Sequence, residues 1–186
     1  IDVTQVGAYP DFGTPSFSGS MERTFVFWVR TNFDDDAPFT NIDNISFYGS
    51  REAGSGKQVM LTAASGSTNN FILSFQNAEN RYDLGIDTPK DEWYMVGYHI
   101  SGSGEQSDVK LIYNDAVYDR TSFNNDVTID TYAGGGFFNA YEVIGRQIPD
   151  NDTEMSGSVA AYLQYNRELT STEISEIYRL FTNRYS

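Results

Sequence analysis

The 186-residue sequence predicts an all-β protein, a two-sheet antiparallel sandwich that ends in a short C-terminal helix. Two observations predict this class. Apolar runs of about five to eight residues alternate along the chain with clusters of Gly, Ser, Asn and Asp, as in sandwiches built from hairpins. The only helical pattern lies at the C-terminal end, where a capping sequence precedes an apolar stripe.

The expected strands follow from these apolar runs. Residues 24–30 read Thr-Phe-Val-Phe-Trp-Val-Arg, so both faces of the strand are apolar, which is typical of a strand covered on both sides. Further strands are expected at 44–48, 58–62, 71–76, 93–100, 109–113, 117–118, 142–145 and 159–165. Flexible loops are expected at 51–57 and 64–70. Asn114-Asp115-Ala116 predicts a hairpin turn, because Asn and Asp tolerate the positive φ that tight turns require.

The C-terminal helix is predicted by two local patterns. Thr170-Ser171-Thr172-Glu173 is a capping box, in which the first and last side chains satisfy each other's backbone amides. Ile174, Ile177, Tyr178 and Phe181 follow at the spacing of one helix face, which indicates a helix docked on the sandwich. No linker, repeat or charge block divides the chain. We therefore expect one domain over residues 1–186, with 1–23 as an extended N-terminal segment.

Composition excludes several functional classes. The 26 acidic residues against 12 basic ones give a formal net charge of -14, which repels nucleic acid and anionic membranes. Cysteine is absent, which excludes disulfides, a thiol nucleophile and Cys-ligated metals. No window approaches the roughly 18 consecutive apolar residues of a membrane span, so no membrane insertion is expected. The chain begins at Ile1 without a charged and apolar leader, so a removed signal, a fragment or a protein without a signal all fit.

The block before the closing helix reads Tyr165-Asn-Arg-Glu-Leu-Thr-Ser-Thr-Glu-Ile174. It is preceded by an aromatic strand, a Trp-led strand, a hairpin with a Tyr, an "IG" strand end and a Gly-initiated strand, at 25–30, 93–100, 111–118, 143–146 and 157–163. This order of elements resembles the laminin-G-like branch of the concanavalin A-like lectin and glucanase superfamily, and the block at 165–174 is its most specific part. The resemblance covers roughly residues 24–185 and implies a jelly-roll sandwich. This block at 165–174, followed by a short helix and the Asn183-Arg184-Tyr185 tail, is similar to domains common on bacteriophage virions.

The sequence offers little support for catalysis. Retaining glycosidases of this fold carry two Glu on one strand as E-x-D-x-E, and no such run occurs here. Lyases of this fold use a Tyr/His/Arg/Gln cluster, but the only histidine, His99, shares a strand face with Trp93, Met95 and Gly97, which favours a hydrogen-bonded structural role. With one His and no G-x-S-x-G elbow, a hydrolase triad is not indicated. Gly134-Gly135-Gly136 lacks the Lys and Ser or Thr of a phosphate loop and predicts a flexible turn.

Calcium is the one cofactor that the sequence indicates, because the ion prefers six to eight oxygen ligands and acidic loops supply them. Two acidic loops follow expected strands, at Asp34-Asp35-Asp36 and at 147–152. The resemblance extends to calcium-binding relatives of the pentraxin type, and the positions that match their acidic cluster are Gln147, Asp150 and Asp152. Their partner loop carries an Asp-Asn pair where this chain has Gly54-Ser55-Gly56. The alternative is that both loops are solvated acidic turns.

These observations favour a non-catalytic recognition module that binds carbohydrate, displayed on a virion or on a secreted protein and therefore found outside the cell or at a virion surface. One alternative is a structural decoration or adhesion protein that binds capsid or fibre subunits. A third is a polysaccharide lyase or glycosidase, since fold alone does not decide function. Most of the 28 aromatic residues must be core, so the sequence singles out no individual aromatic as a sugar platform, and the ligand-binding residues stay open.

Overall fold

The computed structural model describes residues 22–31, 44–52, 58–64, 70–75, 78–83, 89, 91–100, 108–120, 122–124, 140–144 and 157–185. These residues form the strands β1 (Arg23–Thr31), β2 (Asn44–Glu52), β3 (Gln58–Ala64), β4 (Asn70–Phe75), β5 (Ala78–Asp83), β6 (Trp93–Ile100), β7 (Val109–Tyr113), β8 (Ala116–Tyr118), β9 (Ser122–Asn124), β10 (Ala140–Ile144) and β11 (Gly157–Tyr165), and the helix α1 (Ser171–Tyr185). No described helix has the length and apolar character needed to cross a membrane.

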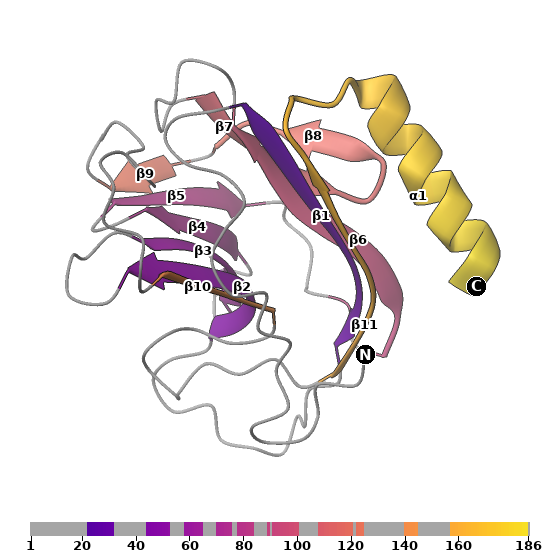
Figure 1. Ribbon diagram of the computed structural model, residues 1–186, viewed down its shortest axis with the longest axis horizontal. Helices are drawn as coiled ribbons and strands as arrows, with labels where there is room; N and C mark the ends of the chain where they lie inside the picture. Colours follow the sequence, from indigo (N-terminus) through magenta and orange to yellow (C-terminus); the bar gives the residue numbers. More distant parts are fainter. Residues whose placement is uncertain are drawn as a thin grey trace.

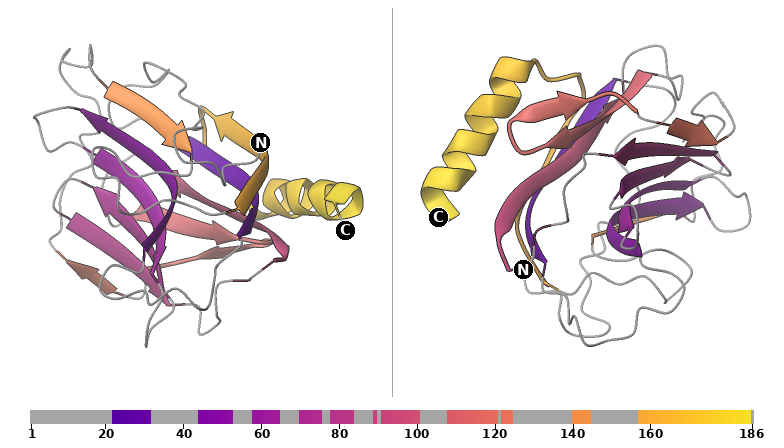
Figure 2. Two further views of the ribbon diagram at one scale, coloured as in Figure 1. Left: turned by 90° about the horizontal axis from the view of Figure 1, so that it is seen from below. Right: turned by 180° about the vertical axis from the view of Figure 1, so that it is seen from behind.

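The strands form two antiparallel sheets. One sheet has the order β11-β1-β6-β7-β8, and the other has the order β10-β2-β3-β4-β5-β9. Figure 1 shows the five-stranded sheet between the six-stranded sheet and α1, and the two views of Figure 2 show the same layers from other directions. The prediction of an all-β, two-sheet antiparallel sandwich with a short C-terminal helix is therefore confirmed.

One of the three inner strands of the five-stranded sheet is β1, which lies between β11 and β6. Every residue of β1 except Arg30 is buried. Phe25 and Phe27 point to the interior of the sandwich, while Val26 and Trp28 belong to a second apolar cluster beneath α1. A strand that is buried on both faces carries apolar residues at successive positions, as the sequence pattern indicated.

Aromatic rings fill the interior face of this sheet. Phe25 stacks on Tyr98 with ring centroids 4.9 Å apart, and Phe27 stacks on Tyr162 at 5.0 Å. The fully buried Tyr82 of β5 donates a 2.7 Å hydrogen bond from its hydroxyl to the carbonyl of Val109 in β7. Because β5 and β7 belong to different sheets, this bond ties the two layers of the sandwich together.

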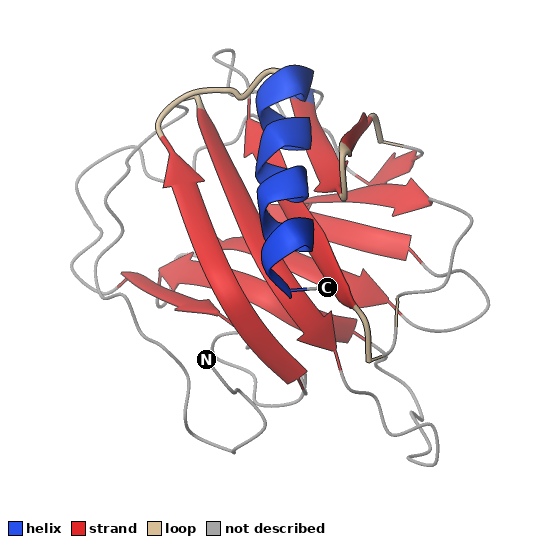
Figure 3. Ribbon diagram, turned by 90° about the vertical axis from the view of Figure 1, so that its right-hand side faces the viewer, coloured by secondary structure: helices blue, strands red, loops and turns tan. Residues whose placement is uncertain are grey.

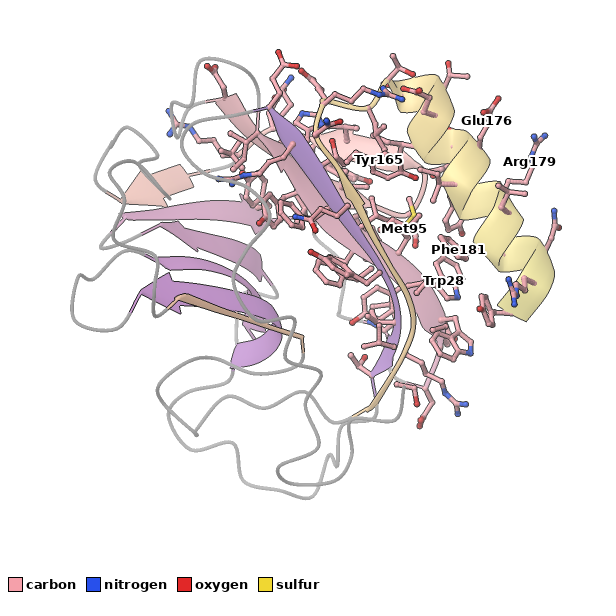
Figure 4. The ribbon with its side chains drawn as sticks, viewed as in Figure 1. Trp28, Met95, Tyr165, Glu176, Arg179 and Phe181 are labelled. Atoms are coloured by element: carbon pink, nitrogen blue, oxygen red, sulfur yellow. The ribbon has the colours of Figure 1, made fainter. Side chains whose placement is uncertain are left out.

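The helix covers the outer face of the five-stranded sheet, as Figure 3 shows with α1 lying along the red strands. Ile174 is fully buried there, and Ile177, Tyr178 and Phe181 pack against the same cluster. In Figure 4 the side chain of Phe181 points from the helix toward Trp28 and Met95 on the sheet. The predicted helix face is therefore the face that docks.

The helix begins with the predicted capping box. The backbone N–H of Thr170 donates to the carboxylate of Glu173 at 2.9 Å, and the N–H of Glu173 donates to the Thr170 hydroxyl at 3.3 Å. The Arg167 guanidinium holds the same carboxylate from the other side, with contacts of 2.9 and 2.5 Å. These donors lower the pKa of Glu173 to about 2, first through Arg167 and then through Thr170.

The connection from β11 to the helix is fixed to the sheet by Thr24. Its hydroxyl donates to the carbonyl of Arg167 at 2.8 Å and accepts from the N–H of Leu169 at 3.2 Å. Both atoms of this buried hydroxyl group are thereby used, which removes the cost of burying it. The position of the helix is therefore set before its first turn.

Some boundaries differ from the sequence predictions. β5 and β9 were not expected, and β5 has the polar sequence Ala-Glu-Asn-Arg-Tyr-Asp. β2 continues through Glu52, and the loop expected at 64–70 begins and ends with residues that belong to β3 and β4. Ladder hydrogen bonds are made by the backbone, so they carry strands into polar residues that hydrophobic patterning does not mark.

The β7–β8 hairpin turns at Asn114 and Asp115, and Ala116, expected in the turn, lies instead in β8 opposite Tyr113. Asn114 has a φ of 52°, as its sequence position predicted. Its side-chain oxygen also accepts a 3.1 Å hydrogen bond from the N–H of Met95 in β6. Of the extended segment expected over residues 1–23, residues 1–21 lie outside the described part of the chain, and Arg23 belongs instead to β1.

Candidate functional site

The predicted calcium ligands Gln147, Asp150 and Asp152 lie outside the described residues, as do Asp34–Asp36. β10, the last described element before Gln147, is an edge strand of the six-stranded sheet and ends at Ile144. Within the described ranges, no three His, Asp or Glu side chains gather closely enough to hold a metal ion. The calcium site at Gln147, Asp150 and Asp152 therefore stays a prediction.

His99 lies near the end of β6 on the face that α1 covers, and its side chain is 3% exposed. Its Nε2 lies 3.3 Å from Oε1 of Glu168, whose side chain is 44% exposed. Neither ring nitrogen makes a hydrogen bond to a described residue. The expectation of a buried structural histidine agrees with this geometry, but the expected hydrogen bond is absent among the described residues, because the Glu168 contact lacks hydrogen-bond geometry.

Burial lowers the pKa of His99, and this effect exceeds the opposing influence of the Glu168 carboxylate. Lys110, its cross-strand neighbour, lowers the pKa further, while Asp119 raises it. The imidazole is therefore neutral near pH 7 and closed off from a large substrate. A general acid or base must reach the proton that it transfers, so this arrangement favours packing over proton transfer.

A second group of polar and aromatic side chains lies at the rim where β6 begins and α1 ends. Trp93 opens β6, and Tyr185 closes α1 with its ring centroid 5.7 Å from that of Trp93. The Arg184 guanidinium lies 5.5 Å from the centre of the Tyr185 ring. Both aromatic side chains are partly exposed, although they also contact the apolar cluster beneath the helix.

Arg30 stands directly opposite Trp93 in the β1–β6 register, so the two side chains share a face of the sheet. The guanidinium of Arg30 lies 3.6 Å from the carboxylate of Asp91, and both side chains are about half exposed, at 48% and 49%. This pair, together with Trp93, Tyr185 and Arg184, is called here the helix-end rim.

The backbone at Asp91 explains how this rim is held. Asp91 has a φ of 58°, a conformation that Asp tolerates better than most residues, and its N–H donates a 2.8 Å hydrogen bond to the carbonyl of Thr31. The Thr31 hydroxyl in turn donates to the carbonyl of Pro89 at 2.6 Å. The segment before β6 is therefore fastened to the end of β1, which fixes the Asp91 carboxylate next to Arg30.

The structure separates core aromatics from rim aromatics, which the sequence could not do. The described aromatic residues that are buried are Phe25, Phe27, Trp28, Tyr82, Tyr94, Tyr98 and Tyr113. Of the two tryptophans in the chain, Trp93 is partly exposed and Trp28 is buried. No sequence pattern marks this site, because the pairing of Arg30 with Trp93 depends on the strand register and not on sequence distance.

Three solved structures illustrate the fold similarity. Domain 4 of AbnA, a GH43 extracellular arabinanase from Geobacillus stearothermophilus solved with arabinotriose, matches with a TM-score of 0.63 and 13% identity over 91% of this chain and 71% of that chain. A heptameric SAP-like pentraxin from Limulus polyphemus matches with a TM-score of 0.60 and 13% identity, covering 95% and 79%. The CBM40 of the Ruminococcus gnavus IT-sialidase, bound to α2,3-sialyllactose, matches with a TM-score of 0.60 and 10% identity, covering 91% and 95%.

No protein-family model matches the sequence, and a search of curated proteins also gives no match. At identities of 10–13% the structural likeness shows a common sandwich fold and does not transfer a ligand or an activity.

Proposed function

We propose that the chain is a non-catalytic module that recognises carbohydrate. The observation that carries this proposal is the fold itself, because two of the similar structures were solved with an oligosaccharide bound and each aligns with 91% of this chain. The sandwich provides a rigid support, and recognition residues are commonly carried by rims and loops on such a support. Partly exposed aromatic and polar side chains at the helix-end rim have the chemistry that sugar binding uses.

A recognition role is favoured over polysaccharide cleavage by the environment of His99. A lyase would need this histidine at its substrate, whereas the side chain is 3% exposed and lies behind Glu168 on the helix side of the sheet. The sequence also lacks the E-x-D-x-E run of the retaining glycosidases of this fold. Non-catalytic binding accounts for both features.

We further propose display outside the cell, on a secreted protein or a virion, where repeated copies would strengthen weak binding. As part of the same proposal, Gln147, Asp150 and Asp152 would hold a calcium ion that either stabilises the loop or bridges the protein to its ligand. The second candidate function is a decoration or adhesion protein that binds capsid or fibre subunits. It is favoured by one observation, the similarity of the block from Tyr165 to Ile174, with its closing helix and Asn183-Arg184-Tyr185 tail, to domains common on bacteriophage virions.

The test is a glycan array probed with the purified chain, with and without a calcium chelator. We expect retention on a restricted set of glycans, together with no reducing ends or unsaturated sugars released from alginate, agar, carrageenan or peptidoglycan. Steady product release that is lost in His99→Ala would establish an enzyme instead. If no glycan is retained and the chain copurifies in fixed stoichiometry with capsid or fibre subunits, the structural alternative replaces the proposal.

A further inference from the structure

The described residues leave few large apolar side chains in contact with water, and Trp93 differs from the others by its surroundings. The most exposed ones are Tyr118 at 36%, on the edge strand β8, and Leu180 at 67%, on the exposed side of α1. Trp93 has a ring of α1, Tyr185, next to its indole, and it stands opposite Arg30, which forms a half-exposed ion pair with Asp91 just before β6. An indole left partly in water beside fixed donors and acceptors is the usual composition of a small-ligand site.

We propose that the helix-end rim is the sugar-binding site of this module, and that it takes a neutral sugar residue stacked on the indole of Trp93. This inference rests on the proposed function and locates the carbohydrate-binding site at the helix-end rim. Tyr185 and Arg184 would support the indole from the helix, while Arg30 and Asp91 would bond to hydroxyl groups at the edge of the sugar ring.

The rim is preorganised for such contacts. Arg30 is the single exposed residue of an otherwise buried central strand, so its backbone cannot shift without disturbing the core. The positive φ of Asp91 and its hydrogen bond to Thr31 hold the carboxylate 3.6 Å from the guanidinium. Backbone conformations of this kind are strained and concentrate at ligand sites. Groups that are already ordered lose little entropy when a ligand binds.

The ion pair of the rim favours a neutral ligand. Arg30 and Asp91 cancel each other, and both can still offer a donor or an acceptor on the side that faces water, while the remaining cation of the rim, Arg184, lies 5.5 Å from the centre of the Tyr185 ring. The whole chain carries a formal charge of -14, which opposes the approach of polyanionic glycans. We therefore expect neutral oligosaccharides to bind and sialylated or uronic acid-rich ones to bind more weakly.

The sequence contains two tryptophans, which gives a direct readout. Trp28 is 2% exposed and lies beneath α1, so only Trp93 can report a ligand at the surface. Titration with arabinotriose, maltotriose, cellotriose and the neutral glycans selected on the array should change the intrinsic fluorescence and protect it from acrylamide quenching. In Trp93→Phe, which keeps an aromatic ring, the fluorescence response should disappear.

Affinity should fall roughly tenfold or more in Trp93→Ala, as expected for an aromatic that dominates a small interface, and several-fold in Arg30→Ala. The matched control is Tyr118→Ala, which removes an exposed aromatic from β8 and should leave affinity unchanged. Thermal unfolding checks that each variant is folded. Should Trp93→Ala not fold, the response of Trp93→Phe and the affinity of Arg30→Ala still decide the matter.

The outcomes separate this inference from the proposed function. If the array selects glycans but Trp93→Phe keeps the fluorescence response and Arg30→Ala keeps the affinity, the site lies elsewhere and the function stands. Preferential binding of sialyllactose over the neutral probes would overturn the ligand class. An array on which the wild-type chain retains nothing overturns both proposals.

Discussion

Trp28 of β1 and Phe181 of α1 stack with their ring centroids 5.6 Å apart and an angle of 21° between the rings. The edge of Tyr178 meets the same indole at 5.8 Å. Two helix side chains one turn apart therefore enclose one tryptophan of the central strand, and the indole nitrogen has no hydrogen-bond partner among the described residues. The outer face of the five-stranded sheet is thus a second core, which exists only while the helix is docked.

The first prediction concerns this second core. Ile174 is fully buried within it, so Ile174→Ala should lower the free energy of unfolding by about 2–5 kcal/mol, and Ile177→Ala, at a less buried position, by the lower end of that range. Denaturant unfolding followed by tryptophan fluorescence measures both. Leu180→Ala, on the exposed side of the same helix, is the control and should change stability by less than about 0.5 kcal/mol. Equal effects at the three positions would contradict helix docking.

The second prediction concerns Gly97 in the middle of β6. Gly97 lies opposite Val26 of β1 in the strand register. A Cβ atom built at Gly97 would lie 2.0 Å from the carbonyl oxygen of Phe25. Backbone atoms of a central strand cannot move away as a flexible side chain can. Gly97→Ala should therefore cost more than about 4 kcal/mol or prevent folding, measured by soluble yield and thermal unfolding.

The control for Gly97 is an alanine substitution in the same strand that only truncates a side chain. Val96→Ala removes two methyl groups from a buried residue and should cost about 1–3 kcal/mol while the protein still folds. If Gly97→Ala were tolerated as well as Val96→Ala, the backbones of β1 and β6 would not approach each other as closely at Gly97 as described here.

The sequence predicted those elements whose signal is local. The capping box at Thr170 and Glu173 and the apolar stripe from Ile174 to Phe181 each depend on residues within two turns of one another, so the helix was found with its docking face. The apolar residues on both faces of residues 24–30 likewise predicted a strand that is covered on both sides. β5 was missed because its stability comes from ladder bonds to β4 and β9 and not from an apolar pattern of its own.

The candidate site could not be predicted in the same way. Arg30, Trp93 and Tyr185 come from three distant parts of the sequence, and they meet only through the β1–β6 register and the direction of the helix. The burial of His99 was predicted from its strand neighbours, but its contact with Glu168 depends on how residues 166–170 cross the end of the sheet. Long-range juxtapositions of this kind are set by topology, which one sequence does not encode locally.

The third prediction tests the calcium proposal. If Gln147, Asp150 and Asp152 hold an ion that the unfolded chain does not bind, calcium at 100 times its dissociation constant should stabilise the protein by about 2.7 kcal/mol. For a chain of this length that corresponds to a rise in melting temperature of roughly 5–10 °C. Asp150→Ala should abolish the rise, whereas Asp35→Ala, in the other acidic loop, should retain it. A wild-type melting temperature that is indifferent to both calcium and chelator removes the proposal.

The fourth prediction is the pH dependence contributed by His99. Because its pKa in the folded protein is lowered, mainly by burial, the unfolded chain takes up a proton that the folded chain resists. Stability should therefore be retained above the ordinary histidine pKa of about 6.5 and decrease as the pH falls from about 7 toward 5. Glu173 acts in a separate window, since its stabilising contribution is lost only below about pH 4.

Two variants test the assignment to His99 with opposite expected signs. His99→Gln removes the titrating group, so the loss of stability between about pH 7 and 5 should become smaller. Glu168→Gln removes the carboxylate that raises the pKa of His99, so the folded-state pKa falls further and the same loss should become larger. Melting temperatures across this range, with the imidazole titration followed by NMR, measure both effects. If the two variants shift the pH dependence in the same direction, the buried imidazole is not its source.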